Sequence, residues 1–196
     1  QNIALTNIGA FAFADCPLQE LQIPASVQQL GSYAFANAPF ASVSFAQGSV
    51  LHTIGPGAFT SCAWLQDIQL PDTLTNIGAE AFSGCGSLRQ LLLPAGLQSI
   101  GDGAFGYSGL TQVTIPASVA YLGDGAFACC HDLPTITVEA GNAYYHDLDG
   151  VVYSVDNASI HAFPAGKETD YYAINAATRT VMPRSFAGVN LVNTIA

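Results

Sequence analysis

The chain has 196 residues, of which half are hydrophobic and only 9% are charged, whereas soluble domains usually carry about 25% charged residues. Its formal net charge of -10 repels phosphate backbones and anionic lipid, so nucleic acid is not an expected partner. No apolar run approaches the roughly 20 residues of a membrane span, which argues against membrane insertion of this segment. The weakly charged, polar surface that this composition implies suits a secreted scaffold better than a cytosolic enzyme.

A ten-residue segment recurs along the chain, in the order "NIGAFAFADC", "QLGSYAFANA", "TIGPGAFTSC", "NIGAEAFSGC", "SIGDGAFGYS" and "YLGDGAFACC". A degenerate copy, "TVMPRSFAGV", follows after an insertion. Each copy carries a phenylalanine at its seventh position, and the first six of these are 22 to 24 residues apart: Phe13, Phe35, Phe59, Phe82, Phe105, Phe127 and, in the degenerate copy, Phe186. A fixed period of this length indicates a solenoid of stacked coils.

Behind each phenylalanine, an alternating triplet predicts a short strand with two inward side chains and one outward side chain. The triplets and the residue that follows read "LQIP", "VSFA", "IQLP", "LLLP", "VTIP" and "ITVE". A coil then supplies about six inward residues, as in Leu74, Ile77, Phe82, Leu88, Leu91 and Leu93. Stacked at the strand spacing of about 4.8 Å, such coils form one continuous core in which each buried apolar side chain contributes about 1.5 to 3 kcal/mol.

The repeat, L-x-x-L-x-L-P-x-x-L-x-x-I-G-x-x-A-F-x-x-C, resembles the BspA-type leucine-rich repeat. That family occurs in surface proteins of anaerobic gut and oral bacteria and of some protozoan parasites. The resemblance implies a right-handed leucine-rich-repeat solenoid, mainly β with short turns or 3-10 segments, and a secreted or cell-surface protein of a gut anaerobe. The family is associated with adhesion to host proteins or to other cells.

The interruption between the sixth and seventh copies also resembles a form seen in that family, a hairpin that here reads "GNAYYHDLDGVVYSVDNASIHAFPAGK". We expect "VVYSV" and "SIHAF" to pair in a hairpin that projects from a continuous array, with Tyr144 and Tyr145 covering the sixth coil. The expected layout is a single solenoid over 1–196, with coils one to six over about 1–140, the insertion over about 141–170 and a degenerate seventh coil over about 171–196. Both ends stop in mid-repeat without a polar capping coil, so we expect a longer native chain.

Cys129, Cys130, His131 and Asp132 look like metal ligands when taken alone. Cys130 has counterparts in Cys16, Cys62 and Cys85, each three residues after the repeat phenylalanine, in a slot that also accepts Ala38, Ser108 and Val189. The slot therefore favours a small inward side chain, and we expect four buried free thiols. Disulfides between adjacent coils are the alternative, which the odd count of five cysteines disfavours. Because Cys129 and His131 would point outward, we expect no metal site and no cofactor.

Other catalytic or ligand-binding patterns are weak. His52, His131, His146 and His161 fall in turns or hairpin positions, and no serine or cysteine stands on a nucleophile elbow beside them, which favours surface histidines. "DLDG" (Asp147 to Gly150) lacks the rest of a calcium loop and fits an Asp-Gly hairpin turn. We therefore expect no enzyme activity.

A binding surface is expected on the outward positions of the triplet strands, which form two polar rows. One row has Gln22, Ser44, Gln69, Leu92, Thr114 and Thr137, and the other has Glu20, Ser42, Asp67, Gln90, Gln112 and Thr135. Leu92 is the only large apolar residue in its row. Trp64 lies in the turn that leads into the strand of the third coil, and Arg89 is close to Leu92 in the sequence. With Tyr107 on the adjoining rim, they form the candidate partner-binding set, although Trp64 could instead cap the edge of its own coil.

The expected function is a noncatalytic module that binds a protein or glycan through one face of the solenoid. Two alternatives remain open: a structural spacer that displays another domain, and an accessory domain of a secreted hydrolase whose catalytic part lies elsewhere.

Overall fold

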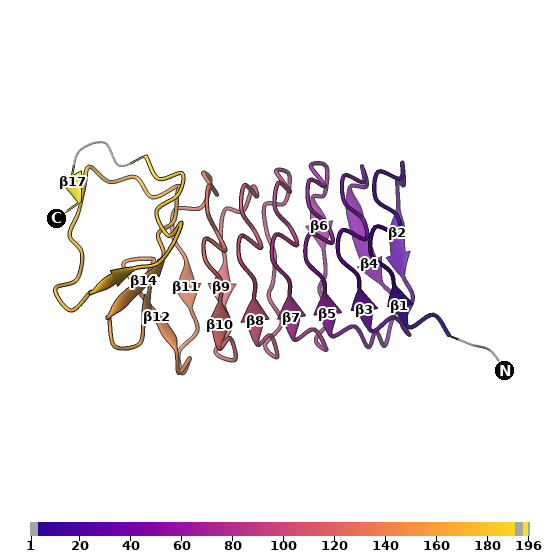
Figure 1. Ribbon diagram of the computed structural model, residues 1–196, viewed down its shortest axis with the longest axis horizontal. Coiled ribbons are helices and arrows are strands. Elements are labelled where there is room, and N and C mark those ends of the chain that lie inside the picture. The colour runs from indigo at the N-terminus through magenta and orange to yellow at the C-terminus, as the bar shows by residue number, and fades with distance from the viewer. Residues whose placement is uncertain (1–3, 191–193, 196) are drawn as a thin grey trace.

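The computed structural model describes residues 4–190 and 194–195. The chain winds into a β-solenoid whose coils stack along one long axis, with the N-terminal coil at one end and the insertion with the seventh coil at the other (Figure 1). No helix occurs in the described residues, and short strands alternate with turns. The predicted solenoid of stacked repeats is therefore confirmed.

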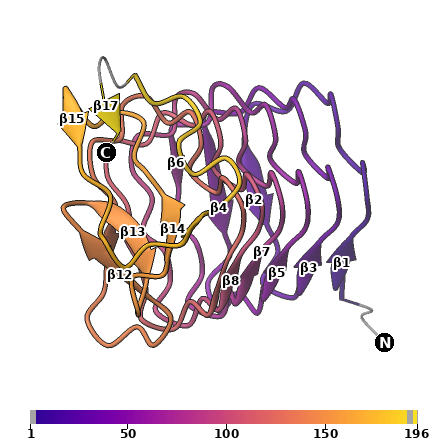
Figure 2. The ribbon, with the colours of Figure 1, turned by 60° about the vertical axis from the view of Figure 1, so that its left-hand side comes forward.

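The longest sheet comes from a segment in which we predicted no strand, the two residues before the Ile-Gly or Leu-Gly step. Its strands are parallel and pair in the order β1 (Asn7–Ile8), β3 (Gln29–Leu30), β5 (Thr53–Ile54), β7 (Asn76–Ile77), β8 (Ser99–Ile100) and β10 (Tyr121–Leu122). In each strand the second residue is buried and the first faces outward. Figure 2 shows β1, β3, β5, β7 and β8 side by side along one side of the solenoid.

The predicted triplet strands form a second, interrupted sheet. β2 (Leu21–Ile23), β4 (Ser42–Phe45) and β6 (Asp67–Ile68) pair in parallel, and β9 (Thr114–Ile115) pairs in parallel with β11 (Thr137–Val138). In the fourth coil, Leu91, Leu92 and Leu93 form no strand. The sheet is thus divided at the fourth coil, although the apolar pattern there is as strong as elsewhere.

A column of stacked phenylalanine rings runs through the core. Phe35, Phe59, Phe82, Phe105 and Phe127 are at most 1% exposed, and successive ring centroids lie 5.2–5.5 Å apart. Such stacked pairs are worth about 0.5–1.5 kcal/mol beyond the burial of their area. The column begins at Phe13, which is 39% exposed because no described coil covers its outer side.

The turn around each repeat phenylalanine has two residues with positive φ, one two positions before the ring and one two positions after it. Around Phe82 they are Glu80 (φ 56°) and Gly84 (φ 75°), and around Phe105 they are Gly103 (φ 59°) and Tyr107 (φ 58°). The same pair flanks all seven phenylalanines, including Phe186. This regularity identifies the degenerate copy around Phe186 as a seventh repeat.

Backbone hydrogen bonds in this turn alternate between two directions. The N–H groups of Glu80, Phe82 and Gly84 donate to carbonyls of the next coil at 2.7–2.8 Å. Those of Ala81, Ser83 and Cys85 donate to the carbonyl three residues earlier at 3.0–3.3 Å. Each turn therefore closes on itself and also binds its neighbour.

The glycine before the turn is required by close packing of the coils. A Cβ added at Gly55 would lie 2.6 Å from the carbonyl oxygen of Leu30 in the preceding coil, which is a steric clash. The equivalent Gly78 and Gly101 meet the preceding backbone at 2.5 Å and 2.4 Å. These glycines set how closely successive coils approach.

The insertion forms a three-stranded antiparallel unit: β12 (Tyr145–Leu148), β13 (Val151–Ser154) and β14 (Ser159–Ala162). The expected pairing of "VVYSV" with "SIHAF" is present as β13 with β14. The expectation that the hairpin projects from a continuous array is wrong, because β14 pairs in parallel with β16 (Thr180–Val181) of the seventh coil. β15 (Tyr171–Tyr172) pairs in parallel with β17 (Thr194–Ile195).

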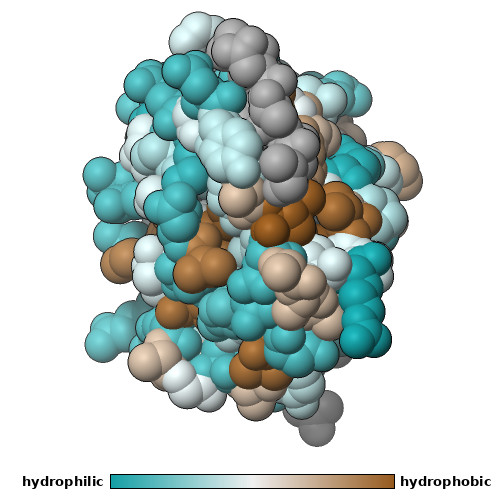
Figure 3. Space-filling view, turned by 90° about the vertical axis from the view of Figure 1, so that its left-hand side faces the viewer, coloured by the Kyte–Doolittle hydropathy of each residue, from teal (hydrophilic) through white to brown (hydrophobic). Residues whose placement is uncertain are grey.

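A second small core explains why the insertion is part of the array. It contains Val151, Tyr153, Ile160, Phe163 and Tyr172. Phe186 stacks on Phe163 at 4.6 Å rather than continuing the column of rings. Seen from this end, polar and apolar side chains are interspersed on the surface (Figure 3).

Side chains of the insertion, among them Tyr145 and Asn142, contact the sixth coil and the turn that leads into it. Tyr145 is 8% exposed and its hydroxyl accepts a hydrogen bond from the Leu122 N–H at 3.1 Å, so it covers this coil as expected. Tyr144 is 53% exposed and does not share that role. The buried Asn142 amide donates to the carbonyls of Pro116 and Val119, both at 3.0 Å. These contacts satisfy backbone groups that a further coil would otherwise bind.

The paired positive-φ residues predict opposite effects of two substitutions in one turn. Gly84→Ala places a Cβ on a left-handed residue and should lower the free energy of unfolding by about 1 kcal/mol. Glu80→Gly removes such a Cβ and should raise it by about 0.5–1 kcal/mol. Chemical denaturation of each variant measures the difference.

Gly86→Ala is the matched control, because a Cβ at Gly86 has no atom within 4 Å and its φ is not positive. It should leave the free energy of unfolding nearly unchanged. Equal losses in Gly84→Ala and Gly86→Ala would contradict the left-handed requirement.

Candidate functional site

The side chains from Cys129 to Asp132 do not converge on one point. Cys130 is fully buried, and its thiol donates to the carbonyl of Phe105 at 3.1 Å, whereas His131 is exposed. Asp132 forms an ion pair with Arg89. Within residues 4–190 and 194–195, no group of three or more His, Cys, Asp or Glu side chains is placed to hold a metal ion.

The cysteine slot is part of the core, as the repeat pattern predicts. The thiols of Cys62 and Cys85 donate to the carbonyls of Phe35 and Phe59, both at 3.2 Å. Burial raises the pKa of the Cys62 thiol to about 12 and also raises those of Cys85 and Cys130. All five cysteines are free thiols. Cys16 is only half-buried, so the expectation that it is buried is wrong.

The histidines differ in exposure, and the Asp-Gly segment forms a turn. His131 is exposed, but His161 is partly buried with its ring against Tyr145 at 4.9 Å, and desolvation lowers its pKa. Asp149 and Gly150 have φ values of 53° and 75° and form the two-residue turn between β12 and β13. Positive φ at both positions is typical of a hairpin turn, so the predicted Asp-Gly turn is confirmed.

A groove runs along the outward side of the interrupted sheet, over the rows of polar residues. One part, of about 870 Å³, lies over the third to sixth coils, and the other, of about 600 Å³, lies over the second and third. The two parts share Asp67 and Gln69. They therefore form one surface along the axis of the solenoid, which we call the axial groove.

Leu92 lies in the axial groove and Trp64 lies outside its lining. The Leu92 side chain is 89% exposed and the Trp64 side chain is 65% exposed, whereas nearly all inward apolar positions are buried. Exposed large apolar groups of this kind are typical of anchors for a partner. The structure leaves both side chains free to make such a contact.

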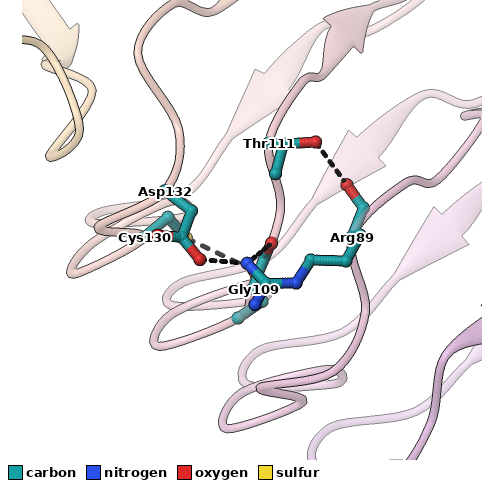
Figure 4. A network of polar contacts seen from close by, with 6 residues as sticks. Arg89, Gly109, Thr111, Cys130 and Asp132 are labelled. Carbon is teal, nitrogen blue, oxygen red and sulfur yellow. Dashed lines mark hydrogen bonds and ion pairs between the residues drawn. The ribbon is translucent and has the colours of Figure 1, made fainter.

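Arg89 is held in a network of polar contacts (Figure 4). Its guanidinium forms the ion pair with Asp132 two coils away and donates to the carbonyl of Gly109 at 3.4 Å. The Thr111 hydroxyl donates to the Arg89 carbonyl at 3.0 Å. Arg89 thus bridges three coils, and its charge is partly neutralised before any partner arrives.

Tyr107 lies in a different part of the coil from the axial groove. It is the positive-φ residue after Phe105, is 57% exposed, and has a pKa raised by its hydrogen bond with Cys129. The structure therefore does not gather Trp64, Arg89, Leu92 and Tyr107 into one pocket. The axial groove itself was missed from the sequence, although most residues of the two outward rows line it.

These coils, turns and stacked rings define a leucine-rich-repeat solenoid. The family model of the BspA type leucine rich repeat region (6 copies) matches residues 2–51. The matched segment carries the BspA-type leucine-rich repeat that the repeat unit indicates. None of the curated protein sequences matches it.

Solved structures of bacterial proteins share the fold. The pneumococcal vaccine antigen PcpA is 28% identical with a TM-score of 0.85, over 93% of this chain and 48% of that one. A leucine-rich-repeat protein from Eubacterium ventriosum is 22% identical with a TM-score of 0.83, over 91% and 47%. A leucine rich cell surface protein from Faecalibacterium prausnitzii is 28% identical with a TM-score of 0.66, over 89% and 54%. The chain spans about half the length of these proteins.

The burial of the slot predicts a wide range of thiol reactivity. Because the nucleophile is the thiolate, Cys62, Cys85 and Cys130 should resist alkylation by iodoacetamide at pH 8 in the folded protein. Only Cys16 and Cys129 should react, and denaturation should expose all five. Mass spectrometry of alkylated peptides checks this order, and rapid modification of Cys85 in the folded state would contradict it.

Proposed function

We propose that the chain is a noncatalytic binding module, secreted or displayed at the cell surface, that recognises a protein or a glycan through one face of the solenoid. The surface location is supported by the leucine rich cell surface protein of F. prausnitzii, which shares the fold and 28% of the sequence. A helix able to span a membrane is absent from the described residues. The whole segment 1–196 is proposed to act as one solenoid.

The placement of side chains supports recognition by the outward face. Inward positions are committed to the core, and the turns are fixed by close packing and positive φ. Outward positions are mostly polar, and each polar hydrogen bond contributes only about 0.5–1.5 kcal/mol net. The exposure of Trp64 on this regular surface is the observation that carries the proposal, because one aromatic anchor can contribute more than about 2 kcal/mol.

Arg89, Leu92 and Tyr107 complete the proposed contact set. They do not converge, so the partner would have to extend over several coils. A solenoid suits such a contact because each coil adds one strip of surface.

The Trp64→Ala variant tests this function. The native protein is first applied to immobilised extracellular-matrix proteins and to a glycan array, and saturable binding is expected on at least one. Trp64→Ala should then weaken that binding at least about tenfold with an unchanged melting temperature. Tyr144→Ala, which removes another aromatic side chain that is more than half exposed, is the matched control in the insertion and should bind normally.

Two outcomes would contradict the proposal. Unchanged affinity with a melting temperature several degrees lower would show that Trp64 packs the edge of its coil. Absence of saturable binding on every surface would favour a spacer that displays another domain.

A further inference from the structure

The fourth coil lacks the backbone pairing that its neighbours have on the triplet side. The sheet stops at β6 in the third coil and resumes at β9 in the fifth. Among the described residues, no backbone hydrogen bond involves Gln90, Leu91, Leu92 or Leu93. The last bond before them joins the Thr111 N–H to the Arg89 carbonyl at 3.0 Å.

This gap coincides with the larger part of the axial groove. All four residues line it, together with Asp67 and Gln69 on one side and Gln112 on the other. The groove floor therefore has peptide N–H and C=O groups without protein partners. Peptide groups without a partner in the protein can hydrogen-bond to an extended chain that binds beside them.

The charged residues of the axial groove indicate which charge a bound partner would carry. Asp67, Asp72 and Glu139 are carboxylates in its lining, and no lysine, arginine or histidine lines either part. The chain as a whole carries a formal charge of -10. Charge complementarity therefore favours a cationic partner and disfavours an anionic one.

The apolar groups of the axial groove favour a peptide over a sugar. Leu92 is 89% exposed in the lining of the larger part and offers an aliphatic contact. That part has no aromatic side chain on which a sugar ring could stack. An extended peptide supplies main-chain donors and acceptors, positive side chains and one apolar side chain together.

We infer that the axial groove at the fourth coil binds an extended, lysine- or arginine-rich peptide segment with an apolar residue that packs on Leu92. This inference rests on the proposed function and specifies the partner's chemistry at one part of the outward face. Asp67 contributes charge attraction, and the unpaired backbone from Gln90 to Leu93 contributes main-chain hydrogen bonds.

The test uses the full chain and a fluorescent heptapeptide of alternating lysine and threonine with leucine at its centre. Fluorescence anisotropy should show saturable binding that weakens with added salt, because exposed charge pairs are screened. The charge-reversed peptide, with glutamate for lysine, should bind at least about tenfold more weakly. Amide hydrogen exchange at residues 90–93 should be fast in the free protein and slow in the complex.

Matched variants locate the contact. Asp67→Asn and Leu92→Ser should each weaken binding of the heptapeptide about fivefold or more. Glu20→Gln changes a carboxylate of the same outward row in the first coil, outside the axial groove, and Leu148→Ser changes an exposed leucine of the insertion. Both controls should bind like the native protein.

Several results would overturn the inference. One is equal binding of the two peptides, and another is normal binding by Asp67→Asn and Leu92→Ser. A third is displacement of the heptapeptide by a neutral hexasaccharide, which would show that the groove binds glycans. If a surface-bound partner is lost in Trp64→Ala but retained in Asp67→Asn and Leu92→Ser, the inference fails while the proposed function stands.

Discussion

The alternating hydrogen bonds of the phenylalanine turn are the constraint on which the rest of the solenoid depends. In each copy, a left-handed residue stands on either side of the ring, so that consecutive N–H groups point in different directions. One N–H closes the local turn and the next reaches the adjacent coil. The ring between them therefore takes the equivalent position in every coil, and the centroids of successive rings lie 5.2–5.5 Å apart.

The same geometry accounts for the cysteine slot and the limits of the core. A residue three positions after the ring points inward, beneath the phenylalanine carbonyl of the preceding coil, where a thiol makes a weak hydrogen bond of 3.1–3.2 Å. Where the array changes at the insertion, the ring of Phe163 takes over as the partner of Phe186, and a second core begins. Packing of the repeat therefore accounts for the cysteine slot, which in the sequence alone suggests a chemical site.

The sequence allowed the architecture to be predicted because the period of the phenylalanines is visible without structure. The six-stranded sheet was missed since a strand of two residues, such as Asn76–Ile77, has no alternation to detect. The left-handed positions were missed because Tyr33, Glu80 and Tyr107 occupy them as well as glycine. The docking of β14 against the seventh coil depends on contacts between segments whose pairing no local pattern specifies.

The candidate site was only partly predictable for a related reason. Leu92 and Trp64 stand out in the sequence as departures from their rows, and both are exposed in the structure. The ion pair between Arg89 and Asp132 crosses two coils and has no local signature. The axial groove depends on the spacing between coils, which a list of outward residues does not contain.

A repeat protein can lose pairing on one side of a coil because its other sides still hold it. The fourth coil keeps its parallel pairing of Asn76 with Ser99, and its turn still donates from Gly84 to the carbonyl of Gly106 at 2.8 Å. The rings of Phe82 and Phe105 remain stacked beneath it. Stability contributed by these contacts allows the triplet side of one coil to leave its backbone unpaired and its leucine exposed. In a solenoid, such a local departure from the repeat is where a surface can differ from its neighbours, and therefore where recognition of one partner can arise.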